Sequence, residues 1–230
     1  MKEQLDLIEM IHNLLQVDDE SFGLYAFSRD ILKERIPYHK KLEMIKKSMD
    51  CGKTYARLII KECGCSNANT IAEYLNLKII SQNESITGNR ILFANYTPPD
   101  NIEIMTEPVN QATELIMKKE SILIELFNKN SIMDIIMGHE IFHYLEDKYE
   151  QEIYTRTEKI LLWNFLGFKN YSTIRTLSEI AAMAFTKELN GINFSPFILD
   201  VLLYYGYDYN SAGKIYHNIL GMCSGRCRES

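Results

Sequence analysis

Apolar residues recur at helical spacing along most of the chain, and the period changes only near its middle. In the first segment Leu5, Ile8 and Ile11 recur with the period of a helix, so we expect the first 50 residues to be helical. Cys51-Gly52 predicts a break in this helical region. After the break we expect two further helices, over residues 53–64 and 67–77.

Three short isoleucine-rich runs follow, separated by turn residues. They predict three antiparallel strands, over residues 77–81, 90–96 and 101–106. In the last run Ile102 and Ile104 alternate with Asn101 and Glu103, which is typical of a strand with one buried face. We expect this strand at the edge of the sheet, where an extended peptide could add itself through backbone hydrogen bonds. Plain sheet structure is the alternative.

The second half of the chain again predicts helices. Pro108 suits the first turn of a long helix that runs to about Asn128, and Gly191 ends another helix that begins near Thr173. The aromatic run around Trp163 predicts either a short buried helix or an apolar cover. Two last helices, broken near residue 206, lead to a flexible tail over residues 223–230. The predicted fold class is α+β, mostly α, with a small antiparallel sheet.

The amino-acid composition and net charge exclude several kinds of protein. With 46% hydrophobic and 24% charged residues among 230, the chain has enough apolar material for a large core. The formal net charge of -6 argues against partners such as nucleic acid or an anionic membrane. The N-terminus lacks the pattern of a targeting signal, and no apolar run is long enough to span a bilayer. We therefore expect a cytoplasmic protein with neither nucleic acid nor membrane as a partner.

The five cysteines do not predict a disulfide framework, because their number is odd and their spacing uneven. Cys63-Gly64-Cys65 and the Cys223/Cys227 pair could form two halves of a metal site. Neither has the usual spacing of structural zinc, so ordinary reduced thiols are the simpler interpretation.

One predicted helix contains the motif H-E-x-x-H at His139, Glu140 and His143. Ser131 is a suitable N-cap for this helix, with Asp134 three residues later. One helical turn separates the histidines, so both imidazoles project from one face and can bind a single Zn²⁺ ion. Glu140 is then close enough to act on a metal-bound water. The alternative is that two core histidines flank a surface glutamate by chance.

A catalytic zinc ion usually has three protein ligands and a water, so the two histidines leave one ligand missing. Glu179 is the best candidate, because it lies on a predicted helix that can pack beside the first. Ala182, one turn later, is small enough to allow close approach. Glu158 and Glu188 are competing candidates, and a solvated helix glutamate is the alternative to any ligand role.

Two motifs resemble those of the ImmA/IrrE-type zinc metallopeptidases. The family's H-E-x-x-H pattern matches residues 139–143, and its E-x-x-A-x-x-F pattern matches residues 179–185. The stretch ILFANYTPPDNIEI resembles the strand, turn and strand that precede the family's catalytic helix. The resemblance covers about residues 50–220. The chain departs from the pattern at Ala181, where a glutamate is usual, and at residues 188–190, where Leu-Met-Pro is common.

The resemblance implies a zincin-like metallopeptidase core with additional N-terminal and C-terminal helices. On this basis we assign residues 1–50 to a helical extension, 51–222 to the catalytic domain and 223–230 to the tail. In this family two histidines and a helix-borne glutamate bind zinc, and the motif glutamate is the base. The resemblance thus assigns zinc binding to His139, His143 and Glu179, and the role of base to Glu140.

The sequence therefore predicts a zinc endopeptidase that cleaves a protein or peptide partner, for which the resemblance suggests a transcriptional repressor or a mobile-element regulator. A non-catalytic zinc-containing interaction or sensor protein of the same fold is the alternative. In a third interpretation the N-terminal helices bind a regulator or nucleic acid, and the core is a scaffold. A peptidase also needs a donor for the oxyanion besides zinc. Tyr204, Tyr205 and His217 are candidates, unless they serve in aromatic packing.

Overall fold

The computed structural model of the chain describes residues 6–82, 86–87, 90–91, 93–119, 121–126 and 132–229. Helices dominate this part of the chain, together with a small three-stranded sheet and two hairpins. The prediction of an α+β fold that is mostly α is therefore confirmed. The predicted N-cap at Ser131 and the loop before it lie outside the described residues.

The N-terminal part consists of helices that pack along and across one another. They are α1 (Leu7–Leu14), α2 (Asp19–Ser28), the 3-10 helix η1 (Lys33–Arg35), α3 (Tyr38–Cys63) and α4 (Ala68–Tyr74). α3 continues without interruption through Cys51-Gly52, so the predicted break is wrong, and the assigned boundary after residue 50 falls inside this helix. A side chain on Gly52 would overlap the carbonyl oxygen of Ala181 in α9 (Arg175–Asn190). Gly52 therefore lets two helices approach closely and does not end one.

The small sheet has the strand order β1 (Lys78–Gln82), β5 (Asn101–Met105), β4 (Ala94–Thr97). β4 and β5 are antiparallel, but β1 and β5 are parallel, so the fully antiparallel sheet is a wrong prediction. The connection from β1 to β5 is long enough for a parallel pair, and it includes the hairpin of β2 (Ile86–Thr87) and β3 (Arg90–Ile91). β5 buries Ile102 and Ile104 as the alternation predicts, but it is the central strand, and β4 lies at the edge.

The second half of the chain places two helices against each other. The described part of the helix predicted after Pro108 consists of α5 (Thr106–Lys119) and α6 (Ser121–Leu126), and residue 120 between them lies outside the described residues. Next come α7 (Ile132–Lys148), α8 (Tyr154–Thr157), β6 (Lys159–Phe165) and β7 (Phe168–Thr173), and then α9, which packs against both α7 and α3. The chain ends in α10 (Ile198–Tyr207) and α11 (Tyr209–Glu229), so helix continues through most of the predicted flexible tail.

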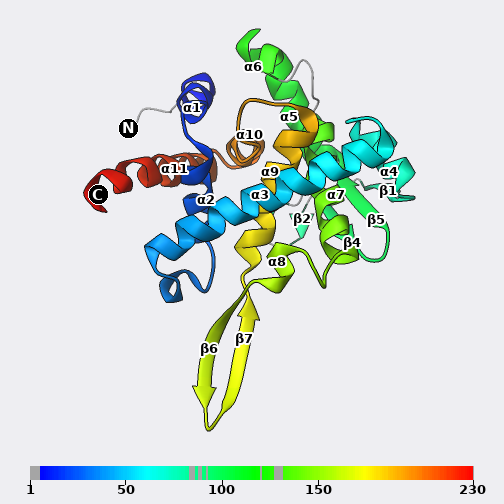
Figure 1. The fold of residues 1–230 in the computed structure, drawn as a ribbon. Helices are drawn as coiled ribbons and strands as arrows, with labels where there is room; N and C mark the ends of the chain where they lie inside the picture. The colour runs from blue at the N-terminus through cyan, green and yellow to red at the C-terminus, as the bar shows by residue number, and fades with distance from the viewer. Residues whose placement is uncertain are drawn as a thin grey trace.

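The aromatic run around Trp163 forms neither a buried helix nor a cover over the protein. Strands β6 and β7 pair as an antiparallel hairpin, which projects away from the body in Figure 1. Its two-residue turn consists of Leu166 and Gly167, with φ angles of 50° and 86°. Positive φ at both turn residues matches the twist of paired strands, and this turn chemistry decides for a hairpin.

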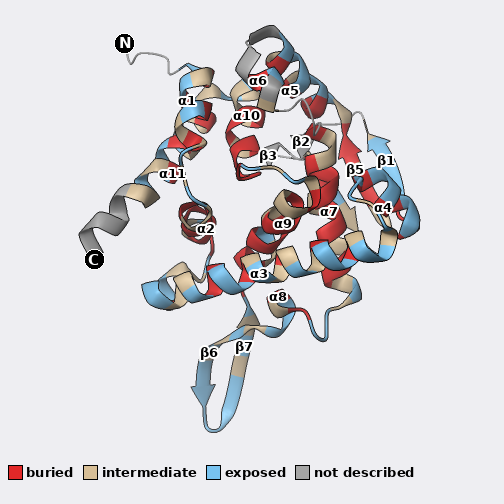
Figure 2. Cartoon of the chain, turned by 45° about the horizontal axis from the view of Figure 1, so that its top comes forward, coloured by how far each residue is buried: buried red, intermediate tan, exposed pale blue. Residues whose placement is uncertain are grey.

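A hydrophobic core connects the N-terminal and C-terminal helices, and it extends from Leu7 in α1 to Ile219 in α11. Figure 2 shows the buried residues concentrated on helices such as α7, α9 and α10, whereas the β6–β7 hairpin is largely exposed. None of the described helices is both long and apolar enough to cross a lipid bilayer.

Candidate metal centre

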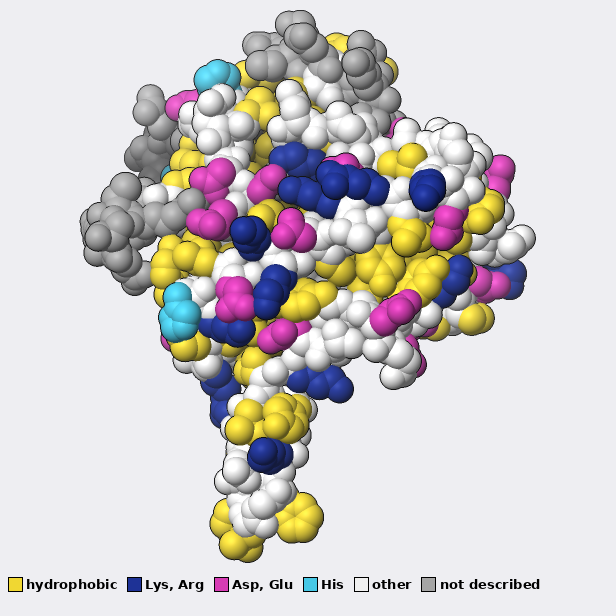
Figure 3. Space-filling view, viewed as in Figure 1, with side chains coloured by type: hydrophobic (Ala, Val, Ile, Leu, Met, Phe, Trp, Pro, Cys, Tyr) yellow, Lys and Arg dark blue, Asp and Glu magenta, His cyan; other side chains and the backbone are white. Residues whose placement is uncertain are grey.

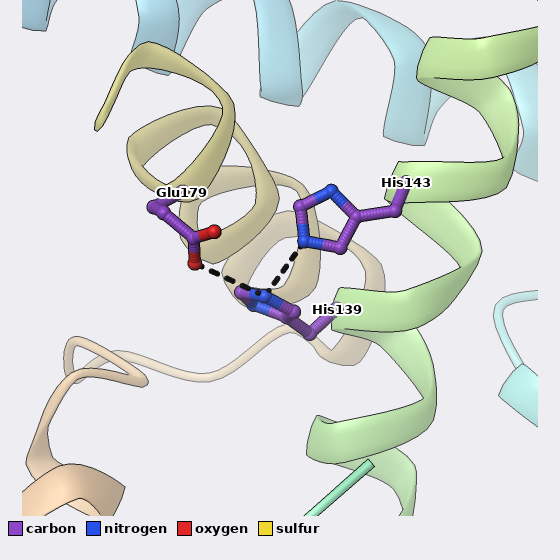
Figure 4. A group of neighbouring side chains, drawn as sticks. All are labelled: His139, His143 and Glu179. Carbon is purple, nitrogen blue, oxygen red and sulfur yellow. Dashed lines mark hydrogen bonds and ion pairs between the residues drawn. The ribbon is translucent and has the colours of Figure 1, made fainter. Parts of the chain in front are cut away.

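Three side chains with metal-binding atoms converge between α7 and α9 (Figure 4). Nε2 of His139 lies 3.0 Å from Nε2 of His143 and 3.4 Å from Oε2 of Glu179. One potential ligand atom from each residue lies within 4.8 Å of the other two. The structure therefore brings together the three residues that the sequence selects as ligands.

The three side chains fit a zinc ion in chemistry, and the spacing of His139 from each of the other two residues fits as well. Two imidazole nitrogens and a carboxylate oxygen are a donor set of catalytic zinc sites, which leave a fourth position open. In a tetrahedral site with bonds of about 2.0–2.2 Å, neighbouring ligand atoms lie about 3.3–3.5 Å apart. The two distances from Nε2 of His139, 3.0 and 3.4 Å, are close to this spacing. Glu179 is 50% exposed and His139 only 16%, so solvent reaches the centre from the glutamate side.

Close packing of α7 on α9 holds the ligands at this distance. Gly138, directly before the motif, lies so near Thr186 of α9 that a β-carbon would sit 3.3 Å from its side chain. Ala181 and Ala182 are fully buried in α9. Small residues on both helices thus permit the approach predicted from Ala182 alone. A glutamate at position 181, as in the family pattern, would be buried without solvent, which carries a desolvation cost.

The buried carboxylate of Glu146 supports His143 through the Nδ1 side of its imidazole ring. Nδ1 of His143 lies 3.2 Å from Oγ of Ser178, which donates a 2.8 Å hydrogen bond to Oε2 of Glu146. Because the serine proton goes to Glu146, the serine oxygen accepts from Nδ1–H of His143, and Nε2 is left unprotonated toward the centre. Glu146 is 2% exposed and also pairs with Arg156 at 3.2 Å. Burial raises the pKa of Glu146, but contacts with His143 and Ser178 outweigh burial and lower it.

Sequence reasoning missed this support. Glu146 follows His143 by three residues, so its position on the same helical face was a usable signal. The contribution of Ser178, from a different helix, had no local signal. Such a hydrogen-bond chain fixes the tautomer and orientation of a ligand histidine.

The pKa values of His139 and Glu179 show a strong mutual attraction. Burial alone would lower the pKa of His139, but the hydrogen bond and charge of Glu179 raise it to about 9. Burial alone would raise the pKa of Glu179, but the hydrogen bond and charge of His139 lower it to about 2. In the metal-free protein a proton therefore occupies this pair, and a bound cation must displace that proton.

Glu140 lies beside the ligands and is held by the sheet. Its Oε2 accepts a 2.7 Å hydrogen bond from the backbone N–H of Tyr96 in edge strand β4. The side chain is buried, yet it borders a cleft of about 320 Å³. The remaining wall of this cleft comes from β4, α7, α8, the end of β7 and the start of α9, and includes Asn95, Pro98, His143, Arg156, Thr173, Arg175 and Glu179. The carboxylate that the sequence assigns as base thus faces open space next to the candidate centre.

The other sequence candidates lie elsewhere. Glu188 accepts a 2.7 Å hydrogen bond from Arg57, and Glu158 follows α8 outside the three-residue group. Tyr204 packs its ring against Phe93, Tyr205 against Tyr209, and His217 against Tyr216. In the described part of the chain none of these residues borders the cleft, so aromatic packing accounts for the three proposed oxyanion donors.

Comparison of this chain with protein-family models, with curated proteins and with solved structures finds no match. The chain is therefore characterised by its own structure alone, which is a mostly helical α+β fold with a His-His-Glu group at the edge of a cleft.

Proposed function

We propose that this protein is a zinc-dependent endopeptidase with a zincin-like core. The observation that carries the proposal is the convergence of His139, His143 and Glu179 at a cleft that Glu140 also borders. A chance pair of core histidines would need neither a carboxylate from a second helix nor an open cleft. The likeness of the two motifs to the ImmA/IrrE-type metallopeptidases supports the same function.

The protein's own groups suit peptide hydrolysis. Zinc, when bound, lowers the pKa of a coordinated water to about 7 and polarises a carbonyl group. Glu140 acts as general base toward the attacking water and then returns the proton to the leaving amine. The N–H of Tyr96 holds one oxygen of this carboxylate, which fixes its orientation. Ser178 and Glu146 keep Nε2 of His143 free of a proton.

The substrate in this proposal is an extended protein segment that lies along β4. Because the N–H of Tyr96 donates to Glu140, the backbone of β4 at this residue faces the cleft rather than β5, and its carbonyl oxygen is the group that can accept a hydrogen bond from an added segment. A segment paired with this edge would pass over Glu140 and the ligands. The family resemblance suggests a transcriptional repressor or a mobile-element regulator, in the cytoplasm, as the source of the segment.

The test combines metal analysis with a conservative variant. Purified protein is expected to hold about one zinc per chain and to cleave a degenerate peptide library, followed by mass spectrometry. Glu140→Gln should keep the zinc and lower the cleavage rate by about 10²- to 10⁴-fold, because a general base contributes that much. Glu150→Gln, an exposed change just beyond the same helix, is the matched control.

Undiminished cleavage by the Glu140→Gln variant would refute the mechanism. Zinc binding without any cleavage, and with identical behaviour of both variants, would favour the non-catalytic sensor or interaction protein.

A further inference from the structure

The β6–β7 hairpin, residues 159–173, borders the cleft with its last residue, Thr173, and exposes large apolar side chains along its length and at its end. At its end Phe165, Leu166 and Phe168 are 67%, 83% and 75% exposed. Three more exposed apolar residues lie behind this tip, namely Leu161, Trp163 and Tyr171. Figure 3 shows hydrophobic side chains gathered at the end of the hairpin. An exposed apolar cluster of this size on a projecting element indicates a binding surface.

Leu166 occupies a turn position whose backbone conformation is unfavourable for leucine. Leu166 has a φ of 50°, in the left-handed region that glycine and asparagine adopt far more readily than a γ-branched residue. Burial of the side chain does not offset this conformational cost, since the side chain is 83% exposed. An apolar residue held at the tip against its conformational preference is best explained by a contact outside the protein.

Apolar side chains cover both faces of the hairpin. Phe168 and Tyr171 are three residues apart on β7, so they point to opposite faces, and so do their cross-strand partners Phe165 and Leu161. A protein that packs on one face would leave the other face wet. A lipid surface would cover the tip pair Phe165 and Phe168 on one face and meet Tyr171 on the other face at the level of the headgroups.

The charge of the hairpin is opposite to that of the whole chain. Residues 159–173 contain Lys159 and Lys169 and no acidic residue, although the chain carries a net charge of -6. At the base, Nη1 of Arg35 donates a 2.8 Å hydrogen bond to the carbonyl oxygen of Leu162, which adds a third cation. The hairpin therefore complements a surface that is both apolar and anionic.

We propose that this hairpin docks the protein on an anionic lipid bilayer. The tip enters the boundary between headgroups and acyl chains, which such elements reach to a depth of about 5–10 Å. Trp163 and Tyr171, behind the tip, lie at headgroup level, where aromatic residues of this kind concentrate. Lys169, next to Phe168 on β7, faces the lipid phosphates. Only the turn and the paired strand ends beside it, Phe165 and Phe168, leave water, so the rest of both strands keeps its outward backbone groups hydrated. The sequence-based expectation of no membrane contact used the net charge of the whole chain and not the local charge of this hairpin.

The protein carries its own reporter for this inference, because Trp163 is its single tryptophan. Full-length protein is mixed with vesicles of phosphatidylcholine containing phosphatidylserine, and with vesicles of phosphatidylcholine alone. We expect cosedimentation with the anionic vesicles and a blue shift of the Trp163 emission. Both should weaken with added salt, which screens the lysines.

Variants locate the contact. Phe165→Ser with Phe168→Ser should weaken vesicle binding at least about tenfold, because burial of each aromatic side chain contributes to membrane affinity. Leu166→Asn should weaken binding while it retains the turn, so loss of the hairpin cannot explain that result. Ile31→Ser with Met117→Ser is the matched control, since these side chains are 92% and 74% exposed elsewhere.

Absence of binding to anionic vesicles would overturn the inference. So would a Trp163 blue shift that appears without vesicles as protein concentration rises, because the tip would then contact a second copy of the chain. The metal-free protein and the Glu140→Gln variant should bind vesicles as the wild type does, so this inference and the peptidase proposal can fail separately.

Discussion

The candidate metal centre and the β6–β7 hairpin are neighbours in the sequence but differ in how they are held in place. β7 ends at Thr173, directly before the helix that carries Glu179. At the centre, side chains from two helices are held by further groups on the same helices, such as Ser178 and Glu146. The hairpin has its own strand pairing, a turn and a hydrogen bond from Arg35 to the carbonyl oxygen of Leu162. Tertiary packing thus positions the centre, whereas local turn chemistry forms the hairpin and leaves its side chains free to contact something else.

The largest expected difference between the two regions is in stability. Phe142 is fully buried and lies 5.6 Å, between ring centroids, from Phe185 across the α7–α9 contact. Phe142→Ala should lower the free energy of unfolding by about 3–5 kcal/mol, because it leaves a cavity. Phe168→Ala, which removes the same atoms from an exposed position, should change it by less than about 0.5 kcal/mol. Urea denaturation of both variants measures this, and equal effects would refute the contrast.

A smaller effect is expected from the support behind His143. Glu146→Gln should weaken zinc binding about 10- to 100-fold, because it disturbs the chain of hydrogen bonds that fixes the tautomer of His143. The measurement is competition with a chromophoric chelator. Asp147→Asn is the control, since Asp147 is the next residue and borders the same cleft but contacts the hydroxyl of Tyr96. Equal zinc affinities of the two variants would show that Glu146 does not position the ligand.

The His139–Glu179 pair should make the metal-free protein sensitive to pH. The pKa of His139 is raised from 6.5 to about 9, so its contribution to stability is complete below pH 6.5 and is lost as pH rises through about 9. The pKa of Glu179 is lowered from 4.5 to about 2, so its contribution is complete above pH 4.5 and is lost as pH falls through about 2. Stabilisation by the pair should therefore be complete between about pH 4.5 and 6.5.

Denaturant unfolding of wild type and Glu179→Gln, both without metal, tests this window. The difference in unfolding free energy should be largest near pH 5–6 and should shrink toward pH 10. Zinc affinity should show the opposite trend and rise with pH up to about 9, because the metal displaces the proton on His139. A difference between the two proteins that does not vary with pH would contradict the assigned pair.

The smallest effect is expected at the tip of the hairpin. Leu166→Asn should stabilise the turn by roughly 0.5–1 kcal/mol, because asparagine adopts the left-handed region at less cost than leucine. Amide hydrogen exchange in β6 and β7 should slow accordingly, while exchange in α7 and α9 stays the same. Faster exchange in the hairpin of the variant would mean that Leu166 stabilises the turn.

How much could be predicted from the sequence differs between features set by local spacing and features set by distant parts of the chain. His139 and His143 share one helix, so their spacing alone placed them together, and Glu179 followed from the number of ligands that zinc requires. Gly52 was mistaken for a helix breaker, because its role depends on α9, which lies far along the chain. The parallel pairing of β1 and β5 and the place of β4 at the edge likewise depend on the path of the chain in space. The hairpin was missed although Gly167 was a local signal, because its apolar residues suggested burial.

In the proposed site two imidazoles of α7 and one carboxylate of α9 bind a single zinc ion. Zinc K-edge X-ray absorption on protein loaded with one equivalent of zinc tests this claim most directly. We predict a shell of nitrogen and oxygen ligands at about 2.0–2.2 Å, with the scattering pattern of two imidazoles, that is lost in Glu179→Ala with His143→Ala. A shell of sulfur at about 2.3 Å, unchanged in that double variant, would place the metal at cysteines such as Cys63 and Cys65 and contradict the claim.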